Sequence, residues 1–358
     1  MKLRTILVNE LEAYFASKEY SQTEIIPITR QRIESQVHNP RANPEDPALI
    51  LAEEENGNVL GFIGLLPDYI FQFEKKKVYW ISCWWVHPTK GKSLGVPLLL
   101  AAYQATSGLL LADSIPETLS VFQKSKLFVV AHPKTGLKLF LKPLIKDVLI
   151  RKKPSLKPYS SILHVVDLVL SWIFKPVTIV RAWIYNGSEF VTINELPLKH
   201  TKLLVPPNSS LFQRGVEEFT WIGKYPWIMQ PKKEQETRFY PFSRTASEFK
   251  YFQLEIQVKD PFPAFLFLSI RNGVVKLCYA YIENQDLKII AKSLLAFLYK
   301  IDSKEFISFH GELNDEILSL NLPLILKLAT KYQYVWGKPL GDLPLDKFQY
   351  GDGDAIFT

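Results

Sequence analysis

Glycine, lysine and serine residues are closely spaced after an apolar segment in the first third of the chain. Residues 86–96 have the sequence VHPTKGKSLGV and follow a run rich in aromatic and β-branched residues. A glycine-containing loop that leads into a helix presents free backbone N–H groups at the positive end of the helix dipole, which suits a phosphate. The residues that we expect to line this phosphate-binding site are Trp85, Val86, Lys90, Gly91, Lys92, Ser93, Leu94, Gly95 and Val96.

Three polar side chains at the ends of predicted strands are candidates for proton transfer. His87 follows the aromatic run, and Asp113 and Ser114 follow a short apolar segment. A histidine or a carboxylate can act as a general base, and a hydroxyl can donate a proton. A structural alternative stays open for two of them: His87 as a loop residue without a role, and Asp113 as a helix cap before Pro116.

The elements that must position these residues alternate between strand and helix. Pairs of apolar runs flank an Asn-Gly turn at 56–57, which is typical of a β-hairpin. A proline at the first helical position supports a helix that starts at residue 116. The sequence predicts strands at 48–52, 59–66, 78–86, 109–112 and 127–131, and helices at 98–106 and 116–126. This order indicates an α/β fold.

A second series with the same order follows after residue 186. It predicts strands at 252–258, 264–271, 274–282, 306–310 and 332–336, and helices at 287–299 and 312–331 with a break near Pro323. The repetition indicates an internal duplication. We therefore expect an α/β (α+β) protein with two mixed-sheet domains at 1–135 and 186–358, flanked by helices and joined by a basic and apolar helical connector at 136–185.

The first series resembles the GNAT superfamily of acyl-CoA-dependent N-acyltransferases. Members have a strand ending in Val-x-Pro, then Arg/Gln-x-x-Gly-x-Gly/Ala, then a helix. Here Val86-His87-Pro88 ends the strand, Lys90 takes the Arg/Gln position, Ser93 replaces the first glycine and Gly95 is the last one. The resemblance implies that acyl-CoA binds with its diphosphate on residues 90–95. In the second series the resemblance concerns topology alone.

The resemblance also implies a reaction, in which a small amine attacks the thioester of acetyl-CoA or another acyl-CoA. Phe122 takes the place of a family tyrosine that protonates the leaving thiolate, so Tyr103 or Ser114 would have to replace it. We expect an acetyltransferase-type enzyme whose acceptor is an amine such as an amino sugar. Two alternatives stay open: a non-catalytic acyl-CoA-binding or scaffold protein, and a peripheral membrane acyltransferase with a lipid-linked acceptor.

The second series lacks a glycine-rich loop. It has the acidic segment 283–286 where the phosphates would lie, so we expect it not to bind CoA. Its His310, at the end of a predicted strand, is a weak candidate for substrate contact, and a structural role is favoured for it.

Composition limits the partners and the compartment. The chain has 358 residues, a net charge of +7 and a pI of about 9.1, but it has no arginine-rich tract and no zinc-ligand spacing. We therefore expect neither a nucleic-acid partner nor a metal. Cys83 and Cys278 are its two cysteines, and the N-terminus lacks the apolar region of a secretory signal. These features favour a cytoplasmic protein, peripheral to a membrane if the connector binds lipid.

Basic residues recur in the connector. Lysines stand at every fourth position between apolar residues, which predicts a basic amphipathic helix that Pro143 kinks. Such a surface can be a solvated face, can lie on an anionic membrane surface, or can hold a phosphate-bearing substrate. The basic residues concerned are Lys134, Lys138, Lys142, Lys146, Arg151, Lys152 and Lys153.

Overall fold

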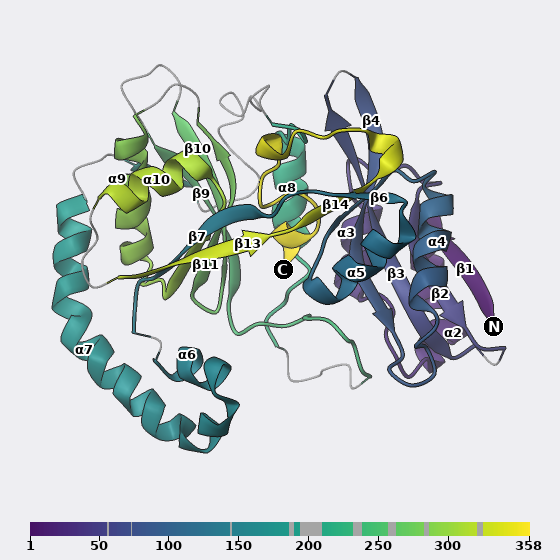
Figure 1. Ribbon diagram of the computed structural model, residues 1–358, viewed down its shortest axis with the longest axis horizontal. Coiled ribbons are helices and arrows are strands. Elements are labelled where there is room, and N and C mark those ends of the chain that lie inside the picture. Colours follow the sequence, from purple (N-terminus) through teal and green to yellow (C-terminus); the bar gives the residue numbers. More distant parts are fainter. Residues whose placement is uncertain are drawn as a thin grey trace. The chain divides into compact units, whose positions relative to one another are not determined.

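The computed structural model divides into two compact units (Figure 1). It describes residues 1–55, 57–72, 74–143, 145–185, 190–193, 210–231, 238–256, 263–282, 286–320 and 325–358. Unit 1 contains Met1–Lys134, Glu195–Phe249 and Tyr332–Thr358, and unit 2 contains Thr135–Asn194 and Lys250–Lys331. The segments of the two units alternate along the chain, so the units do not coincide with the consecutive domains 1–135 and 186–358 that the sequence predicts.

Unit 1 is built on a mixed sheet. Its seven described strands have the order β1-β2-β3-β4-β5-β14-β6. β1 to β4 are antiparallel neighbours, β5 runs parallel to β4, and β14 is antiparallel to both β5 and β6. The bounds are Lys2–Leu7 (β1), Pro47–Glu53 (β2), Val59–Phe71 (β3), Lys75–Val86 (β4), Leu110–Asp113 (β5), Phe128–Val130 (β6) and Tyr334–Gly337 (β14).

Helices cover both faces of this sheet. On one face α4 and α5 pack through Leu98, Leu99, Ala102 and Phe122 against strand residues such as Ile81. On the other face α1, α2 and α3 pack through apolar side chains of their own, and residues 239–242 join them. The helices of this unit are α1 (Leu11–Ala16), α2 (Lys18–Gln22), α3 (Arg30–Val37), α4 (Gly95–Ala105), α5 (Pro116–Ser125) and α8 (Val216–Lys224).

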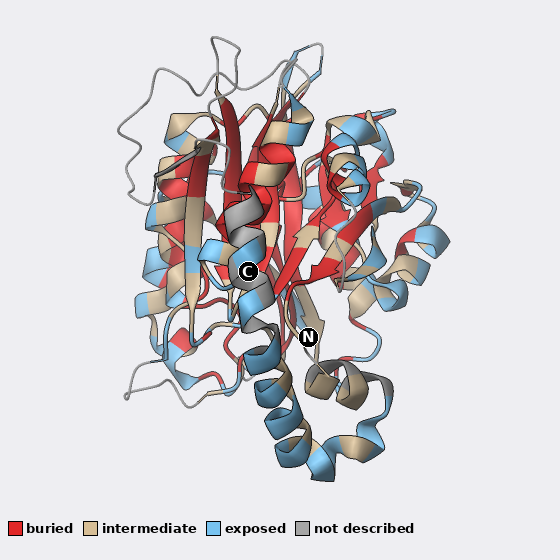
Figure 2. Ribbon diagram, turned by 90° about the vertical axis from the view of Figure 1, so that its left-hand side faces the viewer, coloured by how far each residue is buried: buried red, intermediate tan, exposed pale blue. Residues whose placement is uncertain are grey.

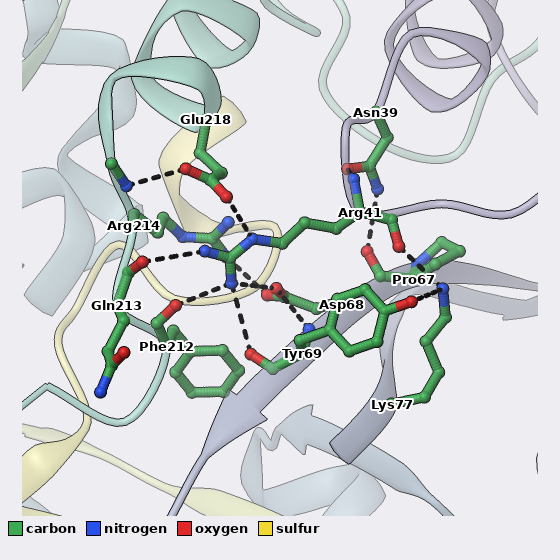
Figure 3. Close-up of polar contacts among 11 residues, drawn as sticks. Asn39, Arg41, Pro67, Asp68, Tyr69, Lys77, Phe212, Gln213, Arg214 and Glu218 are labelled. Carbon is green, nitrogen blue, oxygen red and sulfur yellow. Dashed lines mark hydrogen bonds and ion pairs between the residues drawn. The ribbon is translucent and has the colours of Figure 1, made fainter. Parts of the chain in front are cut away.

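A buried network of charges ties α8 to the sheet of unit 1 (Figure 3). Arg41 donates from Nε to Glu218, at 2.7 Å, and from Nη1 to Asp68, at 2.9 Å. Its Nη1 and Nη2 also donate to the carbonyls of Phe212 and Gln213. Arg214 donates to the second oxygen of Asp68, at 2.6 Å. Each buried charge here faces an opposite charge, which is what burial of ions requires.

Unit 2 is built on a second mixed sheet, with the strand order β13-β7-β12-β11-β10-β9-β8 among its described residues. The strands are β7 (Lys134–Phe140), β8 (Phe190–Ile193), β9 (Phe249–Ile256), β10 (Ala264–Arg271), β11 (Val274–Tyr281), β12 (Glu305–Ser308) and β13 (Leu326–Tyr332). The helices are α6 (Ile145–Lys152), α7 (Ser160–Tyr185), α9 (Leu287–Lys300) and α10 (Gly311–Ser319), with the short 3-10 helix η2 (Pro154–Tyr159) between α6 and α7.

The two sheets repeat one topology. In each, a hairpin (β3–β4 or β10–β11) leads through a helix into a parallel strand (β5 or β12). The next position in each sheet is filled by a strand from the other half of the chain, β14 in unit 1 and β7 in unit 2. The predicted fold class, with two mixed sheets and flanking helices, is confirmed. The reciprocal exchange of β7 and β14 was not predicted.

Two predicted helices are wrong in part, since the structure has helices only at Gly311–Ser319 (α10) and Ile145–Lys152 (α6) within them. Residues 134–140 form β7, in which Leu137, Leu139 and Phe140 are buried, because lysines four residues apart also share one face of a strand. Lys134 donates to the Phe348 carbonyl, while Lys138 and Lys142 pair with Glu305 and Asp302. Residues 326–332, predicted as helix, form β13.

Candidate functional site

The central strands β4 and β5 of unit 1 separate toward their carboxyl ends. Their ladder joins Tyr79 to Leu110 and Trp80 to Leu111. Beyond these pairs β4 runs on to Val86, while Asp113 of β5 pairs with Tyr334 of β14. Two parallel strands that diverge at their carboxyl ends form the usual place for a ligand in an open α/β sheet. This end of the sheet is therefore the candidate site.

A β-bulge lies in β4 next to the point of separation. Gly64 pairs with Cys83 and Leu65 pairs with Ile81, so Ser82 is the extra residue. The extra residue of a bulge is left out of the ladder, which re-aims its peptide groups. The carbonyl of Ser82 accepts a hydrogen bond from Nη1 of Arg32 on α3, at 3.2 Å.

The predicted phosphate loop forms a compact turn between β4 and α4. Gly91 is buried, its N–H donates to the carbonyl of His87, and its carbonyl accepts from Leu94, both at 2.9 Å. A Cβ at position 91 would lie 2.6 Å from the backbone nitrogen of His87 and from the carbonyl oxygen of Leu60. Glycine is thus required at position 91 because backbone atoms surround it.

The start of α4 fits an anionic ligand. The first-turn N–H groups of a helix have no acceptor inside the helix, and α4 begins at Gly95 directly after the turn. Lys92 and Ser93 are exposed beside it, and Val96 is half exposed. Lys90 lies 3.6 Å from the carboxylate of Glu54, so part of its charge is already balanced. The loop can hold phosphate groups through Lys92 and the N–H groups of α4.

His87 stabilises this turn. Its Nδ1 accepts hydrogen bonds from the backbone N–H groups of Thr89, at 3.3 Å, and Lys90, at 3.2 Å. Both bonds require an unprotonated Nδ1, so a neutral His87 carries its proton on Nε2 and would have to give up these bonds before it could accept a second proton. The role of His87 as a base stays a prediction.

Asp113 and Ser114 lie at the carboxyl end of β5, as predicted for site residues. Asp113 is exposed, and α5 begins after Ile115 without a side-chain cap, so the capping alternative for Asp113 is not what the structure contains. The Ser114 hydroxyl donates to the Ile115 carbonyl, at 3.2 Å, and lies 3.1 Å from the Thr118 hydroxyl. Their catalytic roles stay predictions.

Aromatic rings link β4 to α5 on the α4 side of the sheet. The ring centroids of Trp84 and Phe122 are 5.8 Å apart, and those of Phe122 and Phe128 are 4.9 Å apart. Phe122 is buried and has no proton to give. Tyr103 packs against Phe128, with ring centroids 5.6 Å apart. These rings form an apolar wall from which water is excluded.

Two tyrosines from the end of the chain join the site. Because β14 pairs with β5, Tyr334 lies beside Asp113, and Tyr332 precedes it. Burial, with the nearby charge of Asp113, raises the pKa of Tyr332 well above its ordinary value, so this phenol stays protonated. Sequence reasoning missed both tyrosines, since only the exchanged strand brings them to this end of β5.

Two carboxyl groups in unit 1 have a raised pKa. Burial and a hydrogen bond with Glu19 raise the pKa of Glu53 to about 7. Burial also raises the pKa of Asp352 to about 7. Glu53 ends β2, two strands and roughly 10 Å from β4, so it could reach the crevice only through water or substrate. Such groups can act as bases near neutral pH.

The corresponding end of the second sheet holds a structural histidine. His310 begins α10, and its Nδ1 accepts from the backbone N–H of Leu313, at 3.3 Å. Of the acidic segment predicted to repel phosphates, residues 283–285 lie outside the described residues, and Asp286 caps α9 through its side chain.

Comparison with known proteins yields matches among solved structures. No protein-family model matches the sequence, and no curated protein matches it. A putative acetyltransferase from Pyrococcus horikoshii is 10% identical, with a TM-score of 0.47, covering 100% of this chain and 95% of that one. A probable N-acyltransferase from Enterococcus faecalis is 12% identical, with a TM-score of 0.48, covering 93% and 71%.

A further match is N-myristoyltransferase from Saccharomyces cerevisiae with bound myristoyl-CoA. It is 10% identical, with a TM-score of 0.47, and the match covers 94% of this chain and 82% of that chain. Each of these three matches covers at least 93% of this chain.

Proposed function

We propose that the chain is an acyl-CoA-dependent N-acyltransferase that acts on an amine. The observation that supports this proposal is the separation of β4 from β5. The turn that follows β4 requires glycine at position 91 and leads into α4. Lys92 and the N–H groups of α4 would hold the phosphates of acyl-CoA, and the acyl end would enter between the two strands. An amino sugar is one acceptor of this chemical class.

The reaction would join the amine nitrogen to the acyl carbon and break the carbon–sulfur bond. The proton that the amine loses would pass to a base at the carboxyl end of β5, where Asp113 lies, or to Nδ1 of His87 once it gives up the N–H groups of Thr89 and Lys90. The thiolate would take a proton from a hydroxyl at the same end, either Ser114 or Tyr332. The wall of Trp84 and Phe122 would keep water away from the thioester.

Calorimetry with acetyl-CoA tests the binding part of the proposal. We expect saturable binding that weakens roughly tenfold in Lys92→Glu, because the ion pair with a phosphate is replaced by repulsion. Lys124→Glu, an exposed lysine on α5, serves as the matched control and should bind as the unchanged chain does. No binding of CoA or acetyl-CoA would remove the proposal.

Release of free thiol with a panel of amines tests catalysis. Thiol release that depends on an amine supports the transferase. Acyl-CoA binding without thiol release for any amine supports the alternative, a non-catalytic acyl-CoA-binding protein, which Phe122 and Ser93 suggest.

A second candidate function is that of a peripheral membrane acyltransferase, because much of α7 in unit 2 is exposed (Figure 2) and several of its exposed residues are apolar. They recur at three- and four-residue spacing and so share one helix face. Trp172, at 77% exposure, is the most exposed of them. The exposed apolar residues of this face are Ile162, Val165, Val166, Val169, Trp172, Ile173 and Val180. No described helix is long and apolar enough to cross a membrane.

The elements beside this face are basic. Asp167 of α7 accepts from the backbone N–H groups of Ile145 and Lys146, which fastens α6 to α7. Lys153 and Lys157, between the two helices, are exposed. An apolar helix face next to exposed basic residues suits an anionic bilayer surface. Three of the basic residues predicted for this contact already bind acceptors within the protein. Lys134 donates to the Phe348 carbonyl, Lys138 pairs with Glu305 and Lys142 pairs with Asp302.

Flotation with lipid vesicles tests this second candidate. We expect the chain to float with vesicles that contain anionic lipid, and Trp172→Glu to reduce the floating fraction. Leu318→Asp, which changes an exposed apolar residue of α10, is the matched control. Equal failure to float with neutral and anionic vesicles excludes the membrane function, and a dimer at the same concentration would assign the face to a second copy.

A further inference from the structure

Arg32 of α3 is a buried cation whose guanidinium group is only partly satisfied. It is 4% exposed, and its Nη1 donates to the carbonyl of Ser82. Among the described residues, no second hydrogen bond and no ion pair involves this guanidinium, although it has five N–H donors. Arginine is almost never fully buried without a partner, so the site calls for an acceptor that is not part of the described chain.

Arg41 shows how the same unit satisfies an arginine that has only a structural task. Its guanidinium faces the carboxylates of Asp68 and Glu218 and three backbone carbonyls (Figure 3). Both arginines are equally buried, at 4% and 5% exposure. The difference in partners therefore sets Arg32 apart from an arginine that only stabilises the fold.

Two more donors lie beside Arg32 without a partner. The ring centroid of Trp227 is 4.0 Å from the guanidinium carbon, and that of Tyr240 is 5.9 Å from it. Both residues are buried, and neither the Trp227 Nε1–H nor the Tyr240 hydroxyl has a hydrogen-bond partner among the described residues. A buried polar group without a partner costs free energy, and two such groups lie beside a guanidinium that makes a single hydrogen bond within the described residues.

The charges near this place do not satisfy Arg32. Asp354 is close enough to act on the pKa of Cys83 and of Tyr240, yet it forms no ion pair with Arg32 within the described chain. Burial raises the pKa of the Tyr240 phenol, so this group stays protonated and can donate. A set that contains a cation and two neutral donors suits an anionic acceptor.

We propose that Arg32, Trp227 and Tyr240 form a binding site for the carboxylate of the amine acceptor. The planar fork of a guanidinium matches the two oxygens of a carboxylate, and the indole N–H and phenol can donate to the same oxygens. Arg32 reaches Ser82 in the bulge of β4, from the face opposite α4 and α5. The acceptor would thus approach the crevice from one face and acyl-CoA from the other. That the bound ligand is the amine acceptor rests on the proposed function, whereas the binding of a carboxylate at this site does not.

Calorimetry without acyl-CoA tests the site with matched ligand pairs. The pairs are amino acids of increasing length and the amines that lack their carboxylate, for example β-alanine and ethylamine, with inorganic phosphate as a separate arm. We expect saturable binding for carboxylate-bearing ligands with Kd of about 1 mM or tighter. Arg32→Gln should weaken this binding roughly tenfold or more, and Tyr240→Phe by several-fold, since each loses a donor to an anion.

The controls separate the site from folding and from catalysis. Tyr240→Phe keeps the ring and removes a hydroxyl without a partner, so folding should be unaffected. Tyr14→Phe removes another buried hydroxyl without a partner in unit 1 and should leave binding unchanged. Equal binding of amines with and without a carboxylate, equal binding in Arg32→Gln, or no carboxylate binding at all overturns the inference.

Phosphate binding that exceeds every carboxylate and depends on Arg32 also overturns it in favour of a phosphate site. Carboxylate binding in a chain that fails to bind acetyl-CoA would leave this site standing and remove the proposed transferase.

Discussion

Replacement of Arg41 should strongly lower the free energy of unfolding of unit 1. Arg41→Ala leaves Glu218 without its cation and removes one of two arginines from Asp68. Breaking a buried pair in this way costs about 3–5 kcal/mol. Denaturant unfolding measures the loss. Arg30→Ala breaks an exposed pair with Glu34 and should change stability by less than about 0.5 kcal/mol, so equal losses in the two variants would contradict the prediction.

Asp352 should make stability depend on pH. Burial raises its pKa to about 7 from 3.8, with Arg214 acting in the opposite direction, so the folded chain holds a proton that the unfolded chain releases. Stability therefore falls as pH rises from about 4 to 7.

Asp352→Asn cannot ionise, while its oxygen can still accept from the Gln349 N–H. We expect its melting temperature, relative to that of the unchanged chain, to rise between about pH 4 and pH 7. Thermal unfolding at several pH values measures this difference. A difference that does not vary with pH would show that Asp352 titrates normally.

Single residues of the site were predictable where the local sequence alone determines the backbone conformation. The turn before α4 was predicted from the spacing of its glycines, and Gly91 lies where backbone atoms leave no room for a Cβ. Tyr332 and Arg32 could not be found this way. Their importance depends on partners from distant segments, and no local pattern marks a buried cation that lacks an anion.

The turn between β4 and α4 gives a test at the scale of one element. Gly91→Ala places a Cβ against backbone atoms that cannot yield, so we expect a loss of about 1–3 kcal/mol and weaker acetyl-CoA binding. Gly95→Ala is the matched control, because its Cβ would make an ordinary contact with Trp84 at 3.6 Å. Denaturant unfolding and calorimetry measure both effects, and a tolerated Gly91→Ala would show that the turn can rearrange.

Elements with strong local signals were predicted well. The Asn272-Gly273 pair adopts positive φ at both residues, as a two-residue hairpin turn requires, and β10 and β11 flank it as expected. The spacing of Lys134, Lys138 and Lys142 led to a wrong helix prediction, because residues four positions apart share a face in a helix and in a strand. Tertiary pairing with β12 then selected the strand. The mostly polar sequence of α3 gave no sign that its Arg32 and Ile33 are buried.

At the scale of the molecule, each sheet is completed by a strand from the other half of the sequence. A fragment of residues 1–135 lacks β14, so β5 and β6 would lose their common neighbour. Unpaired strand edges promote aggregation. We expect this fragment to be insoluble or to lack a cooperative unfolding transition, and co-expression with residues 136–358 to rescue it. A soluble fragment that unfolds cooperatively by circular dichroism would contradict this expectation.

The repeated order of elements was visible in the sequence, but the grouping of segments was not. The local sequence indicates which segments form strands. The pairing of strands that are far apart in the sequence depends instead on which edge of a sheet is left without a neighbour. Segments such as Glu195–Phe249 belong to unit 1 although they follow much of unit 2 in the chain.

The exchange of β7 and β14 also bears on the order of events during synthesis. β14 ends at Gly337, so the sheet of unit 1 cannot close until residue 337 has left the ribosome, long after β1 to β6. Nascent chains that expose open sheets for long are targets of chaperones, and folds dominated by distant pairings form slowly. The site between β4 and β5 is thus completed only after the roughly 200 residues between β6 and β14 have been synthesised.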